Sequence, residues 1–494
     1  MDTILAGLDA GTTGVRCMLF STDGREISRA YREYSSSYPL PGWVEQNPQE
    51  ILQSSFAVCR EAIAKSGVCP ESIKAVGFSV QRSVCCLIDK FGQPLGNFIS
   101  WQDNRCVEQA QELARGISPE EYYRVSGLPI GATWVGAKIL WLRENQPQRF
   151  AQAARIVQLG DYLLRCFGAD DFYTDMSSSV FYGLWDVQKG NWNQSRLDEL
   201  ELDKSILGVP TPSATRLGTI SPQIAEKTGF AVGTAICLAA GDQNCSTVGM
   251  GGITPGAATV TLGTCGLAVL TVDTPVAGFG GMMITNHPVR GLWGIEGITN
   301  AAACSYSWLR NQIGTGTADN SFEQLNRLAA ESAPGANGVV FTPYLAGSAS
   351  PNWNLNARGA FNGISLSTSR ADLIRAAGEG IIYEIKSIID AWNQAGYSTA
   401  SVRVGGGFAQ SAFWNQIQAD IYGVPVQTLR CSESACLGAA AMAGSGVNVF
   451  SSIVQACQAM VRTEEQLLPC KNNASVYQER LGQFNCFFRR VYSC

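Results

Sequence analysis

Residues 4–21, Ile-Leu-Ala-Gly-Leu-Asp-Ala-Gly-Thr-Thr-Gly-Val-Arg-Cys-Met-Leu-Phe-Ser, decide the fold. Two short aliphatic runs, residues 4–8 and 15–21, predict strands on either side of the glycine turn Gly11-Thr-Thr-Gly14. A third strand is predicted over residues 27–34, after the turn at Asp23-Gly24. The chain therefore opens with a meander of two hairpins.

The same pattern recurs near the middle of the chain. Residues 257–262 and 267–272 predict strands that flank Gly263-Thr-Cys-Gly266, and this turn matches Gly11-Thr-Thr-Gly14 except at Cys265. Helix-like segments over residues 49–64, 300–311 and 370–395 alternate with predicted strands over residues 75–80, 339–345 and 402–405. We expect two similar α/β halves, each a mixed sheet flanked by helices, with a boundary near residue 245 and a ligand between them.

Composition limits the class of protein. The chain has 494 residues, of which 46% are hydrophobic and 16% charged, so it is globular and long enough for two large domains or three smaller ones. A net charge of −5 gives no basic surface for nucleic acid. No apolar run approaches the ~20 residues that cross a bilayer, so we expect no membrane partner. The N-terminal residues show no secretion signal, which predicts a cytoplasmic location.

The cysteines and the histidine exclude further classes. Seventeen cysteines is an odd number, and many lie in apolar runs, so we expect buried reduced thiols. His287 is the only histidine and no paired CxxC spacing occurs, which leaves little for a zinc site or a histidine-based triad.

Three strand ends carry residues suited to phosphate chemistry. Asp9 ends a strand before Gly11-Thr-Thr-Gly14, where turn amides can meet phosphate oxygens and the carboxylate can hold Mg²⁺; the alternative is a plain hairpin turn. Asp242 follows the predicted strand 235–240 and can take a hydroxyl proton, although it can also cap a helix starting at Gln243. The Gly405-Gly-Gly407 turn lets a nucleotide approach the backbone, although such triplets are commonly only tight turns.

Together these motifs resemble the FGGY carbohydrate kinases over essentially the whole chain. The resemblance also covers Gly42-Trp-Val-Glu45, Trp101-Gln-Asp-Asn-Arg105, Gly241-Asp-Gln243 and Asn356-Ala-Arg-Gly359. It implies two actin-like, ribonuclease-H-like domains that close over a catalytic cleft. Residues 1–244 would mainly bind the acceptor, and residues 245–494 would mainly bind ATP.

The resemblance also implies roles for individual residues. Asp242 would be the general base, and Asp9 would be the carboxylate associated with Mg²⁺. The residues expected near ATP are Gly11, Thr12, Thr13, Arg16, Gly263, Thr264, Gly405, Gly406 and Gly407. Those expected at the acceptor are Gln81, Arg82, Trp101, Asp103 and Gln243. Arg82 in a structural ion pair and Trp101 in the core are the alternatives that stay open.

The acceptor itself is predicted less directly. Glycerol kinases carry Gln-Arg-Glu-Thr where this chain has Gln81-Arg-Ser-Val84, and a tyrosine where it has Thr133. Xylulokinases carry Gln-Met-His-Gly at the first of these places, and this chain lacks that Met and His. Smaller side chains at Ser83 and Thr133 favour a four- or five-carbon sugar or polyol, with a xylulose-like ketopentose first. A glycerol or tetritol kinase is the alternative.

Two other functional classes fit the sequence less well. An actin-like ATPase or sugar-responsive regulator without transfer activity is disfavoured by the intact Asp242. A Rossmann dehydrogenase would need Gly-x-Gly-x-x-Gly followed by a distal acid, which is missing. A homodimer is the assembly considered, although the sequence does not determine the oligomeric state.

Overall fold

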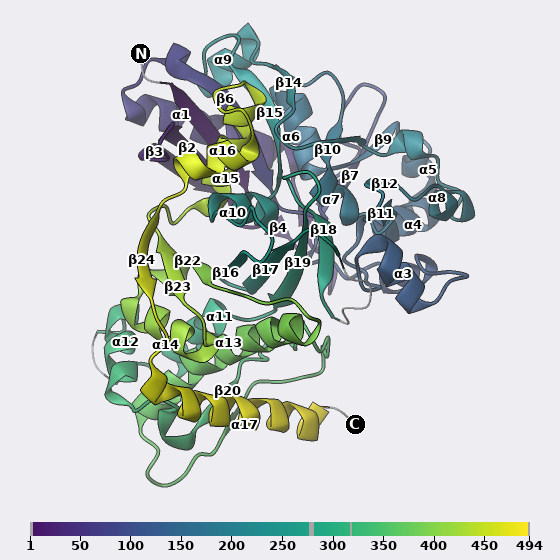
Figure 1. The fold of residues 1–494 in the computed structure, drawn as a ribbon. Coiled ribbons are helices and arrows are strands. Elements are labelled where there is room, and N and C mark those ends of the chain that lie inside the picture. The colour runs from purple at the N-terminus through teal and green to yellow at the C-terminus, as the bar shows by residue number, and fades with distance from the viewer. Residues whose placement is uncertain (1–2, 276–280, 317–318, 493–494) are drawn as a thin grey trace.

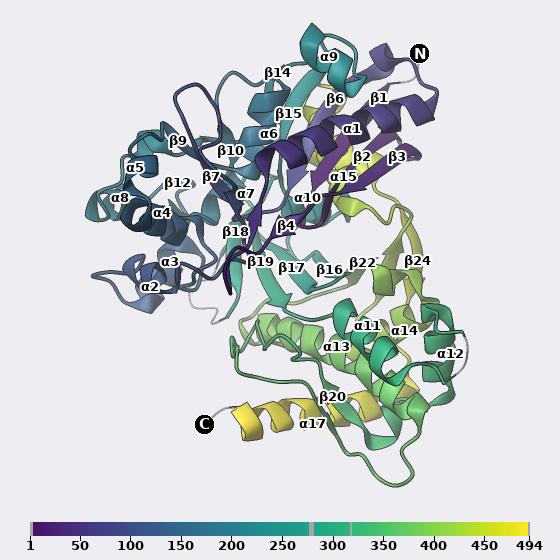
Figure 2. The same cartoon turned by 180° about the vertical axis from the view of Figure 1, so that it is seen from behind.

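The computed structural model describes residues 3–275, 281–316 and 319–492 (Figure 1). Two large mixed sheets lie one above the other, each covered by helices, and helix α10 (Asp242–Gly249) lies between them in both views (Figures 1 and 2). The α/β fold with two similar halves is therefore confirmed.

The first sheet has the strand order β14-β15-β6-β1-β2-β3. Strands β1 and β2 pair antiparallel around the glycine turn, and β1, β6 and β15 are parallel. The turn is too short for a crossover, whereas the long connections from β2 to β6 and from β6 to β15 permit parallel pairing. The strands are β1 (Ile4–Ala10), β2 (Gly14–Ser21), β3 (Glu26–Glu33), β6 (Ile73–Val80), β14 (Arg216–Thr219) and β15 (Ala235–Gly241).

The second sheet, β18-β19-β17-β16-β22-β23-β24, repeats this design. The strands β19-β17-β16-β22-β23-β24 correspond in order to β3-β2-β1-β6-β15-β14 of the first sheet. Each neighbouring pair is parallel or antiparallel as in the first sheet. The strands of the second sheet are β16 (Ala258–Leu262), β17 (Gly266–Val272), β18 (Met283–Asn286), β19 (Trp293–Thr299), β22 (Val402–Gly406), β23 (Val426–Leu429) and β24 (Thr463–Leu467).

One predicted strand lies elsewhere. Residues 339–345 contribute only β20 (Val340–Thr342), which pairs with β21 (Ala360–Asn362) in a separate two-stranded sheet. The position that β6 holds in the first half is taken by β22 in the second. Both segments are apolar and short, so periodicity alone does not tell which one joins the main sheet.

The first half carries a large insertion between β6 and β15, seen on the right of Figure 1, and its sheet is completed by β4 and β5 from the segment between β3 and β6. Its five-stranded sheet has the order β4-β5-β8-β7-β9. Its strands are β4 (Ser36–Ser37), β5 (Glu45–Gln46), β7 (Cys85–Ile88), β8 (Phe98–Ile99) and β9 (Arg155–Gln158), and the short strands β10 (Tyr173–Asp175), β11 (Trp185–Asp186), β12 (Asn191–Trp192) and β13 (Val209–Thr211) follow. Its helices are α2 (Val107–Glu112), α3 (Pro119–Ser126), α4 (Val135–Asn145), α5 (Pro147–Phe150), α6 (Leu159–Phe167), α7 (Met176–Val180), α8 (Gln194–Glu199) and α9 (Pro222–Thr228).

Helix α1 (Pro48–Ser66) shows how local sequence sets these elements. Its N-cap Asn47 accepts hydrogen bonds from two first-turn amides, proline occupies its first position, and Gly67 ends it with a φ of 67°. The other helices of the second half and C-terminal region are α11 (Ala303–Ile313), α12 (Phe322–Glu331), α13 (Arg370–Gln394), α14 (Ala412–Tyr422), α15 (Ser434–Gly446), α16 (Ile453–Met460) and α17 (Ala474–Tyr492).

Helix α15 returns from the second half to the first sheet. Its side chains join a core with β1, β2, β6 and β15, among them Leu437 and Ala440 against Leu5 and Phe20. It also crosses α10 closely, because the crossing residues Gly249 and Gly438 have no side chain. The predicted boundary at residues 244 and 245 falls inside α10, so α10 and α15 together connect the halves.

Other sequence expectations concern cysteine, histidine and the membrane. The described cysteines are unpaired and mostly buried, with Cys69 and Cys470 exposed. His287 is buried, and burial lowers its pKa to about 4. Among the described residues there is no cluster of His, Cys, Asp or Glu that could hold a metal ion. In that same part of the chain, no helix has the length and apolar character needed to span a membrane.

The α10–α15 crossing leads to a stability prediction. A Cβ atom at Gly438 would lie 1.9 Å from the carbonyl oxygen of Cys245, so Gly438→Ala must separate the helices and should lower the free energy of unfolding by about 3 kcal/mol. The matched control is Gly482→Ala in α17, where a Cβ meets nothing within 4 Å; it should be neutral or stabilise by up to about 1 kcal/mol. Urea unfolding of both variants measures the difference, and equal effects would contradict the close crossing.

Candidate active site

The first glycine turn presents amides and occupies its carbonyls. The carbonyl of Gly11 accepts a hydrogen bond from the Tyr34 hydroxyl, that of Thr12 from Gln46 Nε2 at 2.9 Å, and that of Thr13 from the Tyr34 amide at 3.2 Å. The amides of Thr12 and Thr13 have no acceptor among the described residues. Free amides in a tight turn form an anion-binding concavity.

The second glycine turn repeats this arrangement. The carbonyls of Gly263 and Thr264 accept hydrogen bonds from the first amides of the α11 region, Ala303 at 2.9 Å and Ala302 at 3.0 Å. The predicted nucleotide triplet lies directly beside it, because Leu262 pairs with Gly406 in the sheet. Gly406 has a φ of 82°, and a Cβ there would lie 2.5 Å from the Leu262 carbonyl oxygen, so only glycine fits. The structure therefore brings Gly263, Thr264 and Gly405–Gly407 together, and their contact with ATP stays a prediction.

Asp9 and Asp242 end nearby strands of the first sheet, with β6 between them. The Ser79 hydroxyl of β6 donates to Asp9 Oδ1 at 2.6 Å. Burial raises the pKa of the Asp9 carboxyl to about 6; the Ser79 hydrogen bond opposes this, and the negative charge of Asp242 adds to it. The negative charge of Asp9 is therefore destabilised by its surroundings, and a nearby cation would stabilise it.

Asp242 is the first residue of α10, and Gly241 is the N-cap. Its Oδ1 atom accepts a hydrogen bond from the Gln243 amide at 2.8 Å and lies 3.5 Å from Arg82 Nε. Oδ2 accepts no hydrogen bond from the part of the chain that the structure describes. Burial raises the pKa of Asp242 and Arg82 acts in the opposite direction, while 24% of the side chain stays exposed. Asp242 is therefore not the N-cap that the sequence offered as an alternative, because the helix begins one residue earlier than expected, with Gly241 in the N-cap position.

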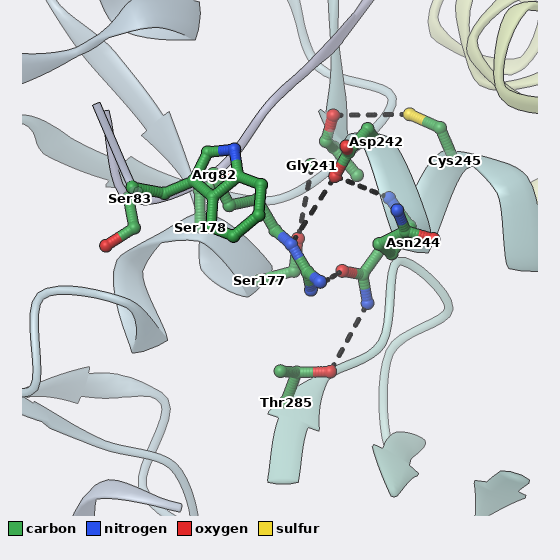
Figure 3. Close-up of polar contacts among 12 residues, drawn as sticks. Arg82, Ser83, Ser177, Ser178, Gly241, Asp242, Asn244, Cys245 and Thr285 are labelled. Carbon is green, nitrogen blue, oxygen red and sulfur yellow. Dashed lines mark hydrogen bonds and ion pairs between the residues drawn. The ribbon is translucent and has the colours of Figure 1, made fainter. Parts of the chain in front are cut away.

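Arg82 lies between Asp242 and Asn244 in Figure 3, with Thr285 beyond Asn244. Its guanidinium also forms a bidentate pair with Glu296 of β19, at 2.8 Å for both contacts. Arg82 thus approaches the predicted base while making the structural ion pair that the sequence left open as an alternative.

Trp101 and Gln81 connect the acceptor region to the first turn. Trp101 Nε1 donates to Thr12 Oγ1 at 3.0 Å. Gln81 is 2% exposed and donates to Gln46 Oε1 at 2.8 Å and to the Tyr34 hydroxyl at 3.2 Å, while its own Oε1 has no partner among the described residues. Trp101 therefore contacts the turn directly, and Gln81 contacts the two side chains that bind the turn carbonyls. The contact of Trp101 and Gln81 with an acceptor stays a prediction.

Asp103 is fully buried, and its carboxylate is occupied. It accepts hydrogen bonds from the Val44 amide at 2.6 Å and from Arg105 Nε and Nη2 at 2.9 and 2.7 Å. The Arg105 guanidinium also pairs with Glu45 and lies over the Trp43 ring, 3.7 Å from its centroid. The predicted acceptor contact of Asp103 stays a prediction, because in this structure its contacts hold the insertion together.

Two acidic partners were not foreseen from the sequence. Arg16 forms an ion pair with Glu433, which immediately precedes α15, and it lies over the Tyr31 ring. Glu296 is the single charge in the apolar strand Trp-Gly-Ile-Glu-Gly-Ile-Thr. A lone acidic residue in such a strand can be used to predict a buried ion pair, because a buried carboxylate almost always has a cationic partner.

Comparison with known proteins gives the family. The model for the N-terminal domain of the FGGY family of carbohydrate kinases matches residues 4–249, and that for the C-terminal domain matches residues 258–447. The chain belongs to this family. A glycerol kinase from Trichodesmium erythraeum is 30% identical over 91% of this chain and 90% of its own length. A xylulose kinase from Staphylococcus epidermidis is 28% identical over 99% and 97%.

Solved structures agree on the fold. A ligand-bound xylulose kinase and a gluconate kinase, both from Lactobacillus acidophilus, each have a TM-score of 0.91 and 23% identity, covering 100% and 99% of this chain and 99% and 98% of theirs. Membership of the FGGY family, shown by the two domain models and the curated relatives, makes this chain an ATP-dependent phosphotransferase acting on a sugar or polyol.

The contacts of Asp103 can be tested by substitution. Asp103→Asn removes the charge that faces buried Arg105, and Glu45 compensates only in part, so the free energy of unfolding should fall by about 2 kcal/mol. Asp171→Asn is the control, because its pair with Arg155 is long, at 3.9 Å, and partly exposed, and should change stability by less than about 0.5 kcal/mol. Urea unfolding distinguishes the two; an unchanged midpoint for Asp103→Asn would argue against this role.

Proposed function

We propose that this FGGY kinase transfers the γ-phosphoryl group of ATP to a hydroxyl of a four- or five-carbon sugar or polyol, with a xylulose-like ketopentose first. The observation that carries the proposal is the position of Asp242 near Arg82 and Asp9, with an Oδ2 atom that has no hydrogen-bond partner among the residues that the structure describes. A coupled assay of ADP release with ketopentoses, aldopentoses, gluconate, tetritols and glycerol tests it.

Asp242 Oδ2 would take the proton of the acceptor hydroxyl. The hydroxyl oxygen forms a bond to the γ-phosphorus, the bond from that phosphorus to the bridging oxygen breaks, and ADP leaves. The Gln243 amide on Oδ1 fixes the orientation of the carboxylate. Because the reaction depends mostly on positioning and charge neutralisation, the two halves contribute more by holding the reactants than Asp242 does by its basicity.

ATP would lie against the two glycine turns and the triplet Gly405–Gly407. The amides of Thr12, Thr13 and Thr264 face phosphate oxygens in this proposal, and Arg16 supplies positive charge. Mg²⁺, when bound, would neutralise charge on the phosphates, and the buried carboxylate of Asp9 with its raised pKa suits such a cation. The first half would then mainly bind the acceptor and the second mainly ATP, and this use of ATP fits the predicted cytoplasmic location.

The acceptor proposal rests on Ser83 and Thr133. Ser83 is 1% exposed, and its hydroxyl donates to the Thr133 carbonyl at 2.5 Å. Its amide donates to Gln158 Oε1 at 2.8 Å, and its carbonyl accepts from Lys138 Nζ at 2.5 Å. Ser83 therefore has no donor left for a substrate hydroxyl, and the site lacks the carboxylate that glycerol kinases carry there. The alternative of glycerol or a tetritol stays open to the same assay.

Removal of the proposed base gives the first functional prediction. Asp242→Asn should lower kcat by at least about 100-fold while ATP affinity changes by no more than about threefold, because the amide cannot accept the hydroxyl proton. Asp390→Asn, in a surface pair with Lys386 on α13, is the control and should keep normal kcat. Steady-state kinetics and calorimetric ATP titration measure both; a parallel loss of ATP affinity and rate would contradict the role.

Substrate preference gives the second functional prediction. Glycerol should have a kcat/KM at least about tenfold below that of the best four- or five-carbon compound, because the site offers fewer groups for its three hydroxyls. Ser83→Glu should raise the ratio of glycerol to ketopentose kcat/KM, and Ser83→Ala serves as its control. Glycerol as the best substrate would refute this account of the pocket.

A further inference from the structure

The ion pair between Arg82 and Glu296 joins the two halves through the interior. Arg82 follows β6 of the first sheet, and Glu296 lies in the middle of β19 of the second. The Arg82 side chain is 9% exposed and that of Glu296 is 0% exposed. The Thr285 hydroxyl donates to Glu296 Oε1 at 2.6 Å, and the Phe181 ring stacks on the guanidinium with a centroid 4.2 Å from Cζ. Both charges are therefore held in one geometry.

The hydrogen bonds of the Arg82 guanidinium fix which of its nitrogens faces each partner. Nη1 donates to Glu296 Oε1 and to Asn244 Oδ1, and Nη2 donates to Glu296 Oε2. Only Nε faces Asp242, at 3.5 Å from Oδ1. A charge-assisted hydrogen bond between an arginine and a carboxylate usually measures about 2.7–2.9 Å, so Arg82 stops short of a full bond with Asp242.

We propose that Glu296 is a positioning residue that holds the Arg82 guanidinium off Asp242 and so keeps that carboxylate free for the acceptor proton. The proposal rests on the proposed function, because it takes Asp242 as the base. It adds a residue of the second half to the control of proton transfer at Asp242.

The physical reason is that Glu296 and Asp242 compete for the buried Arg82 guanidinium. A guanidinium inside the protein needs an anionic partner, because an unpaired buried charge costs several kcal/mol. Without Glu296, the nearest carboxylate to Arg82 is Asp242, and pairing with it would occupy both of its oxygens. A carboxylate in such a pair has a lower proton affinity and accepts the hydroxyl proton poorly.

The charged groups around Asp242 support the expected effect of Glu296, which is to keep the pKa of Asp242 from falling. Burial raises the pKa of Asp242, Arg82 lowers it, and Glu296 raises it again. The other titratable groups that interact with Asp242 are Asp9 on β1 and Tyr34 after β3. Burial lowers the pKa of Arg82, but the carboxylates of Glu296, Asp242 and Asp175 together raise it above its usual range. Arg82 therefore stays charged whichever carboxylate holds it.

The test replaces Glu296 by glutamine. Glu296→Gln keeps the size of the side chain and can still accept from Thr285, but its amide group faces Nη2 with another donor. We expect kcat with the best acceptor to fall at least about tenfold, and the acid limb of the kcat/KM–pH profile to move to lower pH. The KM for ATP should stay within about twofold. Glu296→Asp, with the charge kept but a shorter reach, should shift the acid limb the same way by less.

Glu379→Gln is the matched control. Glu379 pairs with Arg375 at 2.7 Å, with side chains 1% and 6% exposed, and both lie on α13, away from the proposed site. Loss of this pair should reduce thermal stability while kcat and the acid limb stay within error. A loss of kcat in Glu379→Gln equal to that in Glu296→Gln would overturn the proposal, because general loosening would then explain both.

A crystal structure of Glu296→Gln gives a readout that needs no acceptor. The proposal expects the distance from an Arg82 nitrogen to an Asp242 oxygen to shorten from 3.5 Å to about 2.8 Å. An unmoved Arg82, or an acid limb that stays or moves to higher pH, would overturn it and leave the pair as a structural contact. The proposed function fails separately, if Asp242→Asn retains transfer.

Discussion

The architecture depends on the close crossing of α10 and α15. At this crossing a Cβ on Gly249 or Gly438 would overlap a carbonyl oxygen of the other helix, so the two backbones touch without side chains between them. Glycines also let α15 approach the first sheet, since a Cβ on Gly7 or Gly77 would meet its carbonyls. Because α10 begins with Asp242, the same contact that joins the two halves also fixes where the proposed base lies.

A second constraint is electrostatic. Buried charges are stable only when paired, and Arg82 of the first half is held by Glu296 of the second. The partly exposed pair of Arg16 on β2 with Glu433, just before α15, also joins distant segments. Both arginines stand beside the aspartates of the candidate site. The acidic partners therefore set the direction of the positive charges before any substrate arrives, which is the preorganisation that phosphoryl transfer requires.

The duplicated fold explains why the site is built from repeated parts. Each half offers a strand, a glycine turn with occupied carbonyls, and a returning strand, at Gly11–Gly14 and at Gly263–Gly266. The halves differ in what surrounds the turn. In the first, the insertion contributes Trp101 to the Thr12 hydroxyl; in the second, the glycines of β22 lie alongside. One design thus provides both an acceptor side and a nucleotide side in the proposed function.

The sequence by itself determined the two similar halves, the strand–turn–strand motifs, the family resemblance and the candidate residues Asp9 and Asp242, because these depend on short-range periodicity and on residue types at fixed spacing. It did not determine that residues 339–345 leave the main sheet, that α15 packs on the first sheet, or that Asp103 is buried against Arg105. Nor did it pair Arg82 with Glu296. Only the tertiary structure decided these, because each depends on which distant segments meet, and a buried charge takes whichever partner the packing brings within reach.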